Sequence, residues 1–282
     1  MKKYFFAALT LLFVSSTNAQ LELPRLSPKA NVMQVIGYTT ITIEYSRPSV
    51  HERKIWGGLV PYNTVWRTGA NEATVIQFTT DVTLNSKKVP AGRYSLFTIP
   101  TEKDWTVILN KVDKQWGAFN YKEDQDLLRF AVTPTSTNFV ESMLICFSDI
   151  TANSVIINLS WEKIKISFKA EADVLSQAYL KIKEGIANAK PDDWQVFAAS
   201  ANFAADNNIY LDEALTWAER AISMGENYFA YFVKAKLLNK KGNYLDALRF
   251  IERTREAGSK DKNYEFFVTQ VDILEREVKS KL

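Results

Sequence analysis

Apolar and polar residues alternate along the first part of the chain in short runs. Residues 40–45 and 163–168 show this pattern most clearly, and in the second run Ile164, Ile166 and Phe168 share one face of an extended chain. Similar runs occur at 73–80, 82–85, 94–99, 105–110, 128–133, 139–147 and 154–161, with predicted turns at 85–88, 90–92 and 100–104. Because these runs leave little room for helical crossovers, the pattern predicts an all-β antiparallel domain, a sandwich or a jelly roll.

A helical pattern replaces this alternation near residue 170. Tyr210 and Tyr244 lie 34 residues apart and begin two similar runs, Tyr-Leu-Asp-Glu-Ala-Leu and Tyr-Leu-Asp-Ala-Leu. That spacing is typical of tetratricopeptide-like repeats, in which small residues such as Ala214 and Ala247 allow paired helices to approach closely. We therefore expect an all-α helical-repeat domain at 170–282, with an additional helix near 172–189 and a closing helix at about 263–282. A generic helical bundle is the alternative.

The first nineteen residues form a third pattern. Two lysines precede an apolar run from Tyr4 to Val14, and small residues follow at Thr17 and Ala19. This arrangement is typical of a secretory signal peptide, and the apolar run is shorter than the roughly 20 residues that span a bilayer. We predict a signal peptide at 1–19 and a β-sandwich domain at 20–169. The mature protein would be periplasmic or extracellular, without a stable membrane anchor; an uncleaved anchor is the alternative.

Charge and cysteine content exclude several classes of protein. The formal net charge is +3, and removal of Lys2 and Lys3 with the signal peptide would leave 33 basic against 32 acidic residues. This balance does not favour a nucleic-acid partner. Cys146 is the only cysteine, so no intramolecular disulfide is possible. It lies in an apolar run, where an inert buried thiol is expected.

Residues 45–74 are the most unusual segment of the chain. They contain three arginines, two tryptophans and the only histidine, between two predicted strands. Loops of this length are usually functional or disordered, and the aromatic content argues against disorder. We therefore expect an ordered loop that forms a ligand-binding site. The candidate ligand-binding residues are Arg47, His51, Arg53, Trp66, Arg67, Asn71 and Glu72.

Two kinds of ligand suit these residue types. Arginine offers a planar fork to carboxylates and phosphates, which favours a small anionic ligand. Aromatic faces suit sugars, and the rings that would line a groove are those of Trp56, Tyr62, Trp66, Trp105 and Trp116. In the structural alternative, the arginines pair with Glu44, Glu52 and Glu72 and hold the loop closed, and the aromatic rings are core residues.

No catalytic motif is recognisable in the sequence. It has no phosphate-binding glycine loop, no Gly-x-Ser-x-Gly run and no Asp-x-Asp-x-Asp calcium loop, and a single histidine cannot form a histidine-rich zinc site. We therefore predict no catalytic residue, no metal and no cofactor. The alternative is a hydrolase that uses Glu72 or His51 with Arg47 and Arg67, because titratable groups cluster in this loop.

Five runs in the first part of the chain resemble one bacterial family. They lie at 45–49, 56–62, 65–74, 90–100 and 105–110, and the most specific is Val-Trp-Arg-Thr-Gly-Ala-Asn-Glu-Ala-Thr at 65–74. Together they look like the family called domain of unknown function 2911, over about 30–169. The resemblance implies an exported protein of a Gram-negative bacterium, often with helical repeats after the domain, and no established activity. His51 stands where the family usually has lysine, which argues against catalysis by this histidine.

These patterns together predict an exported, non-enzymatic binding protein. The β domain would bind a small anionic or sugar-like ligand, or a peptide, at the loop 45–74. The helical repeats would dock a protein partner, as the concave surfaces of repeat proteins commonly do. A further possibility is that the loop is architectural and that function lies in the helices.

Overall fold

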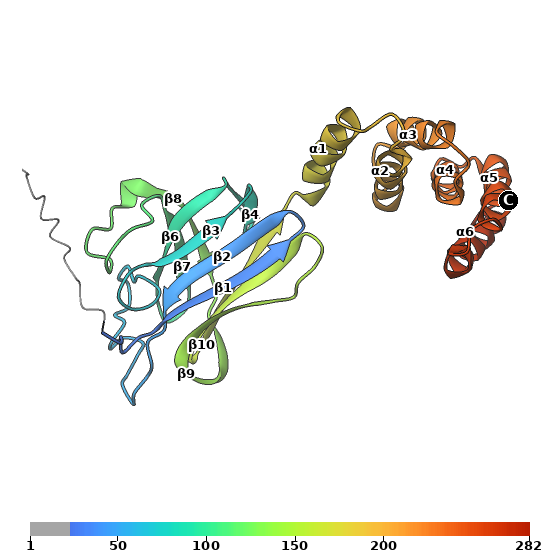
Figure 1. The fold of residues 1–282 in the computed structure, drawn as a ribbon. Helices are drawn as coiled ribbons and strands as arrows, with labels where there is room; N and C mark the ends of the chain where they lie inside the picture. Colours follow the sequence, from blue (N-terminus) through green and yellow to red (C-terminus); the bar gives the residue numbers. More distant parts are fainter. Residues whose placement is uncertain (1–22) are drawn as a thin grey trace, which may run out of the picture. The chain divides into compact units, whose positions relative to one another are not determined.

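The computed structural model describes residues 23–282, so the predicted signal peptide lies outside the described residues. These residues contain ten β-strands and six α-helices (Figure 1). They form two compact units, which divide between Val174 and Leu175. The first unit is built from antiparallel β-sheets and the second from helices, as the sequence predicts.

Two antiparallel sheets form the β unit. The larger sheet contains, in spatial order, β1 (Lys29–Ile36), β2 (Thr39–Ser46), β3 (Thr74–Phe78), β6 (Gly92–Ile99), β7 (Trp105–Asn110) and β8 (Asp126–Val132). The smaller sheet contains β5 (Lys87–Val89), β4 (Val82–Leu84), β10 (Ser154–Ala172) and β9 (Thr135–Ser148). Side chains from both sheets, such as Ile43 and Leu96 from one and Leu159 from the other, form a single apolar core. The predicted antiparallel sandwich is therefore confirmed.

Some strands differ from the predicted ones. Strand β1 was not expected, because its residues show little contrast between its two faces. The predicted turn at 85–88 is shorter: Asn85 and Ser86 form it, with φ of 46° and 69°, and the two lysines that follow lie in β5. The runs 154–161 and 163–168 belong to one strand, in which the pairing with β9 shifts on both sides of Glu162. This irregularity changes the alternation of the side chains and makes one strand resemble two.

The segment between β2 and β3 is ordered by hydrogen bonds to both sheets. The Val50 amide donates to the Glu141 carbonyl at 2.9 Å, and the Met143 amide donates to the Pro48 carbonyl at 2.9 Å. Farther along, Trp66 exchanges backbone hydrogen bonds with Thr98 of β6, at 2.7 and 2.9 Å. These bonds satisfy backbone groups that have no regular strand partner.

Four tryptophans pack together at the centre of the β unit. Trp56 and Trp66 come from the loop, Trp105 from β7 and Trp161 from β10. The rings of Trp66 and Trp161 are stacked at 5.9 Å, and those of Trp56 and Trp105 meet edge to face at 4.7 Å. The expected groove is therefore not formed by Trp56, Trp66 and Trp105, because the last two are buried in the apolar core and Trp56 packs against it.

The helical unit follows the predicted spacing. Its helices are α1 (Val174–Ala187), α2 (Trp194–Asn207), α3 (Leu211–Ser223), α4 (Tyr228–Lys240), α5 (Tyr244–Gly258) and α6 (Val268–Lys279). The pairs α2–α3 and α4–α5 correspond to the two expected repeats, with Ala214 and Ala247 fully buried. The helices are consistent with a tetratricopeptide-like arrangement.

Gly258 tests the packing of this unit. Alanine normally stabilises a helix relative to glycine by up to about 1 kcal/mol. Here a Cβ atom would lie 2.3 Å from Cδ2 of Tyr264, whose buried ring packs against Tyr228. We expect Gly258→Ala to lower the free energy of unfolding of the helical unit by about 1–3 kcal/mol, because the ring must move.

Denaturant unfolding followed by far-ultraviolet circular dichroism measures this effect. Gly185→Ala is the matched control, since its Cβ would meet only Val196 at 3.7 Å, an ordinary contact. Equal stabilisation by the two substitutions would contradict the prediction.

Candidate functional site

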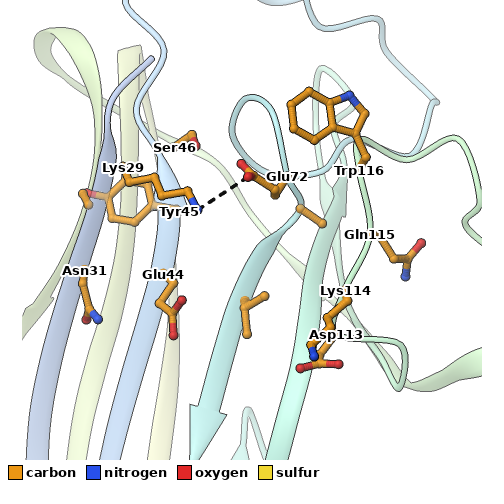
Figure 2. Close-up of a pocket in the computed structure, with 13 residues that line it drawn as sticks. Lys29, Asn31, Glu44, Tyr45, Ser46, Glu72, Asp113, Lys114, Gln115 and Trp116 are labelled. Atoms are coloured by element: carbon orange, nitrogen blue, oxygen red, sulfur yellow. Dashed lines mark ion pairs between the residues drawn. The ribbon is translucent and has the colours of Figure 1, made fainter. Parts of the chain in front are cut away.

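A cleft of about 570 Å³ lies on the outer face of the larger sheet, the face turned away from the core (Figure 2). It is formed by β1, β2, the start of β3 and the segment 113–116. Its main polar and aromatic side chains are Lys29, Asn31, Glu44, Glu72, Asp113 and Trp116. Figure 2 shows Glu72 and Trp116 toward one end of the cleft and Glu44 and Asp113 toward the other.

The register of the strands explains why Asn31 and Glu44 both line the cleft. Asn31 pairs with Glu44 across β1 and β2, and Glu44 pairs with Val75 across β2 and β3. Paired residues project from the same face of a sheet. Glu44 alternates with the core residues Ile43 and Tyr45, so its row points outward.

The segment 111–125 supplies the facing wall, and Asn110 holds its base. The buried Asn110 amide donates to the Lys122 carbonyl at 3.1 Å and to Asp126 at 2.9 Å. Its Oδ1 accepts hydrogen bonds from the Val112 amide and from Gln115 Nε2, both at 3.1 Å. One side chain therefore ties several points of the segment to β7.

The same wall is joined to the end of the loop 45–74. The Gly117 amide donates to the Asn71 carbonyl at 3.0 Å, and the Ala73 amide donates to the Gln115 carbonyl at 2.9 Å. Glu72 and Trp116 form an isolated β-bridge between these contacts. The end of the loop thus forms part of the cleft, although most of the loop does not.

Ion pairs occupy both ends of the cleft. Arg93 of β6 bridges Glu44 and Asp113, at 3.1 Å to each. Glu72 accepts hydrogen bonds from Arg25 at 2.7 Å, and its carboxylate lies 3.5 Å from Lys29 Nζ. The wall also carries Lys114, for which the described part of the chain provides no ion-pair partner.

The ion pairs of Glu72 predict a pH dependence of stability. Burial raises the pKa of Glu72, but the hydrogen bond from Arg25 and the charge of Lys29 outweigh that effect and hold it below its usual value. The stabilisation is therefore complete above the pKa of an unfolded glutamate and is lost as the pH falls through the lower folded pKa. We expect the stability difference between wild type and Glu72→Gln to shrink over that acidic interval in urea unfolding at a series of pH values. A difference that stays constant with pH would contradict the prediction.

Of the seven candidate ligand-binding residues, Glu72 alone lines the cleft. Arg47 Nε donates to the Met143 carbonyl at 2.9 Å, and Arg53 donates to the carbonyls of Ser49 and Val50 at 2.6 and 3.0 Å. These two arginines thus hold the loop in place. The expected pairing of the loop arginines with Glu44 and Glu72 is wrong, because those carboxylates bind the basic groups described above.

The other predicted residues lie around the cleft or away from it. His51 is exposed, and its backbone amide donates to the Glu141 carboxylate at 3.0 Å. Trp66 is buried in the core, and its Nε1 donates to the Gly69 carbonyl. The Asn71 side chain donates to the Ser27 carbonyl. Arg67 is half-buried and does not line the cleft.

Sequence reasoning missed Lys29, Asn31 and Asp113 as site residues. The two β1 residues lie in an unpredicted strand, and Asp113 lies in a segment with no strong pattern of its own. Trp116 belonged to the predicted groove aromatics, and 57% of its surface is exposed beside the cleft. The sequence signal that could have located this part of the cleft was Trp116 together with the polar residue Asp113 close to it.

Two further features are absent from residues 23–282. No three His, Cys, Asp or Glu side chains in this range are grouped so that they could hold a metal ion. None of its helices combines the length and the apolar character needed to cross a bilayer.

The fold and the cleft define a class: a two-sheet β unit with a polar, aromatic-edged cleft on one outer face, followed by paired helices. A family model described as "Protein of unknown function (DUF2911)" matches residues 27–170, slightly more than half of the chain. The protein belongs to this family, as the sequence resemblance indicates. No curated protein and no solved structure matches the chain. The matched residues include the whole cleft, so function is best argued from its geometry.

Proposed function

We propose that the protein is a non-enzymatic binding protein whose cleft holds a small, sugar-like ligand. The observation that carries this proposal is the exposed indole of Trp116 beside a row of polar side chains. An aromatic face packs against the apolar face of a sugar ring, while carboxylates and amides accept or donate hydrogen bonds to hydroxyl groups. The cleft volume of about 570 Å³ lies within the usual range for small-molecule sites.

The paired charges of the cleft suit a neutral polyhydroxylated ligand. Glu44, Glu72 and Asp113 all line it, and each is already held by a basic side chain. A hydroxyl donor can use the remaining lone pairs of the same carboxylates without a charge penalty.

Binding is also better supported than hydrolysis. The lowered pKa of Glu72 makes it a poor proton donor near neutral pH, because its carboxylate stays ionised. His51, the other residue of the hydrolase hypothesis, does not line the cleft. Neither group is therefore arranged as a general acid at the proposed site.

A thermal-shift screen of mono- and disaccharides tests the proposal. We expect at least one sugar to raise the melting temperature of wild type and of Phe119→Ala but not of Trp116→Ala. Phe119 is the matched control, because it is 81% exposed on the same segment and does not line the cleft. Loss of the Trp116 stacking surface should raise the dissociation constant for that sugar about tenfold. The absence of any hit, or an equal response of all three proteins, would contradict the proposal.

Export is part of the same proposal. The predicted signal peptide at 1–19 would bring the cleft into contact with sugars outside the cytoplasm. N-terminal sequencing of the protein from a periplasmic fraction should begin at Gln20. Recovery of the intact N-terminus from the cytoplasm would contradict this part.

We also propose that the helical unit docks an extended peptide segment of a protein partner. A depression of about 250 Å³ lies along α2, α4 and α6, with Phe232, Gln270 and Ile273 in its lining. Ile273 is 53% exposed, so an apolar side chain of a peptide can pack against it. The first helix of each hairpin, α2 and α4, contributes to this surface together with α6. A peptide can therefore follow the surface from one hairpin to the next.

A displayed peptide library provides the test. Peptides selected on wild type should lose binding to Ile273→Glu and keep binding to Leu245→Glu. Leu245 is the matched control, because it is 68% exposed on α5 and does not line the depression. Selected peptides that bind both variants equally would place the docking surface elsewhere.

A further inference from the structure

Arg67 differs from the other arginines of the loop, because no group in residues 23–282 forms an ion pair with it or accepts a hydrogen bond from its Nε. Its side chain is half-buried, and its Nε is fully buried without a hydrogen-bond partner. Its guanidinium forms no ion pair with a described residue. Arg47, by contrast, donates to the Met143 carbonyl of β9, and Arg53 donates to the carbonyls of Ser49 and Val50 within the loop.

The backbone around Arg67 is held firmly. The Arg67 carbonyl accepts a hydrogen bond from the Thr74 amide at 3.1 Å, and the preceding Trp66 is paired with Thr98. Thr68 is fully buried with φ of 54°, a conformation that a β-branched residue rarely adopts. Such strain persists only where the surroundings enforce it, and it is concentrated at functional sites. The backbone at Arg67 is therefore held in one conformation by the fold.

A positioned cation without a partner carries a cost that a ligand can remove. Burial lowers the pKa of Arg67, because no nearby carboxylate offsets the loss of hydration. A guanidinium is a planar set of donors that matches the oxygens of a carboxylate or a phosphate. Because the backbone that carries Arg67 is already fixed, binding has to order only the side chain.

We propose that Arg67 anchors a second binding site, separate from the sugar cleft, which takes a single oxyanion: a carboxylate or a phosphate. The site is distinct because Arg67 does not line the cleft. This inference goes beyond the proposed sugar binding and does not depend on it.

Nuclear magnetic resonance of the arginine Nε–H groups tests the site directly. Inorganic phosphate and acetate are titrated separately into the protein in Tris chloride at constant ionic strength. We expect the Arg67 Nε–H signal to shift and saturate with at least one of the two anions, and the two titrations show which chemistry is preferred. No saturable shift with either anion would overturn the proposal.

Three variants separate this site from its surroundings. The anion-induced rise in melting temperature should be lost in Arg67→Met, with affinity at least about tenfold weaker, because a charged hydrogen bond is removed. It should persist in Arg53→Met, the matched loop arginine, and in Trp116→Ala, which affects the sugar cleft alone. An unchanged response of Arg67→Met would overturn the proposal.

Stability without the anion gives an independent readout. If Arg67 lacks a partner, Arg67→Met should be at least as stable as wild type in Tris chloride, because an uncompensated cation is replaced by an apolar side chain of similar length. A clear loss of stability, or a failure to fold, would show that the guanidinium has a structural partner, and would also overturn the proposal.

Discussion

Trp161→Ala is expected to lower the free energy of unfolding of the β unit by about 3–5 kcal/mol, the range for truncation of a large aromatic residue in a core. Trp161 is 1% exposed and contacts Trp66 by stacking and Trp56 edge to face. Its Nε1 also donates to the Glu141 carbonyl at 3.2 Å, which ties β10 to β9. Truncation therefore leaves a cavity between the sheets and removes one of the two hydrogen bonds that the Glu141 carbonyl accepts, the other of which comes from the Val50 amide.

Hydrogen exchange of β10 amides in increasing denaturant measures this change for the β unit alone. Trp116→Ala is the matched control, since it removes the same ring from an exposed position and should cost less than about 1 kcal/mol. Similar losses in the two variants would show that the four-ring cluster does not stabilise the sandwich as proposed.

Side-chain periodicity was sufficient to predict the strands with one clearly buried face. Strand β7 is an example, because the predicted run 105–110 has the bounds of the strand. Strand β1 escaped prediction because it lies at a sheet edge, where both of its faces are partly exposed. The helices of the second unit were predictable because packing of one helix on another requires small residues at a repeated spacing, as at Ala214 and Ala247.

The site was harder to predict than the fold, because tertiary contacts bring its parts together. Glu44 reaches Arg93, 49 positions away in the sequence, only through the order of three neighbouring strands. Arg47 and Arg53 were predicted to bind a ligand because a sequence shows only side chains as possible partners of an arginine. Their actual partners are main-chain carbonyls, which every residue carries, so the sequence has no signal for these bonds.

The loop 45–74 therefore has two structural roles, whereas its composition suggested a single role as a ligand-binding loop. Its first part joins the sheets through bonds to β9 and contributes Trp56 to the core. Its last part, from Arg67 to Glu72, follows the core residue Trp66 and leads to the cleft wall. The aromatic residues order the segment, and Glu72 at its end lines the cleft.

Asn110→Ala is expected to lower the free energy of unfolding of the β unit by about 3 kcal/mol, because several hydrogen bonds of one buried side chain are lost together. Asn110 is fully buried and is bonded to Lys122, Asp126, Val112 and Gln115. Alanine would leave the Val112 amide and the Lys122 carbonyl without these partners. The cleft wall would then be held to the sheet less firmly.

The same substitution should loosen the cleft before the sandwich unfolds. The amides of Ala73 and Gly117 are bonded across the wall, so their hydrogen exchange should become faster in Asn110→Ala, and sugar affinity should fall with it. Thr106→Ala is the matched control on the same strand: it removes a half-buried side chain and should cost less than about 1 kcal/mol without affecting those amides. If Asn110→Ala loses stability while both amides keep their protection, the wall is held by the Glu72–Trp116 bridge and its neighbours. The shape of the cleft would then be maintained by the end of the loop 45–74 and not by Asn110.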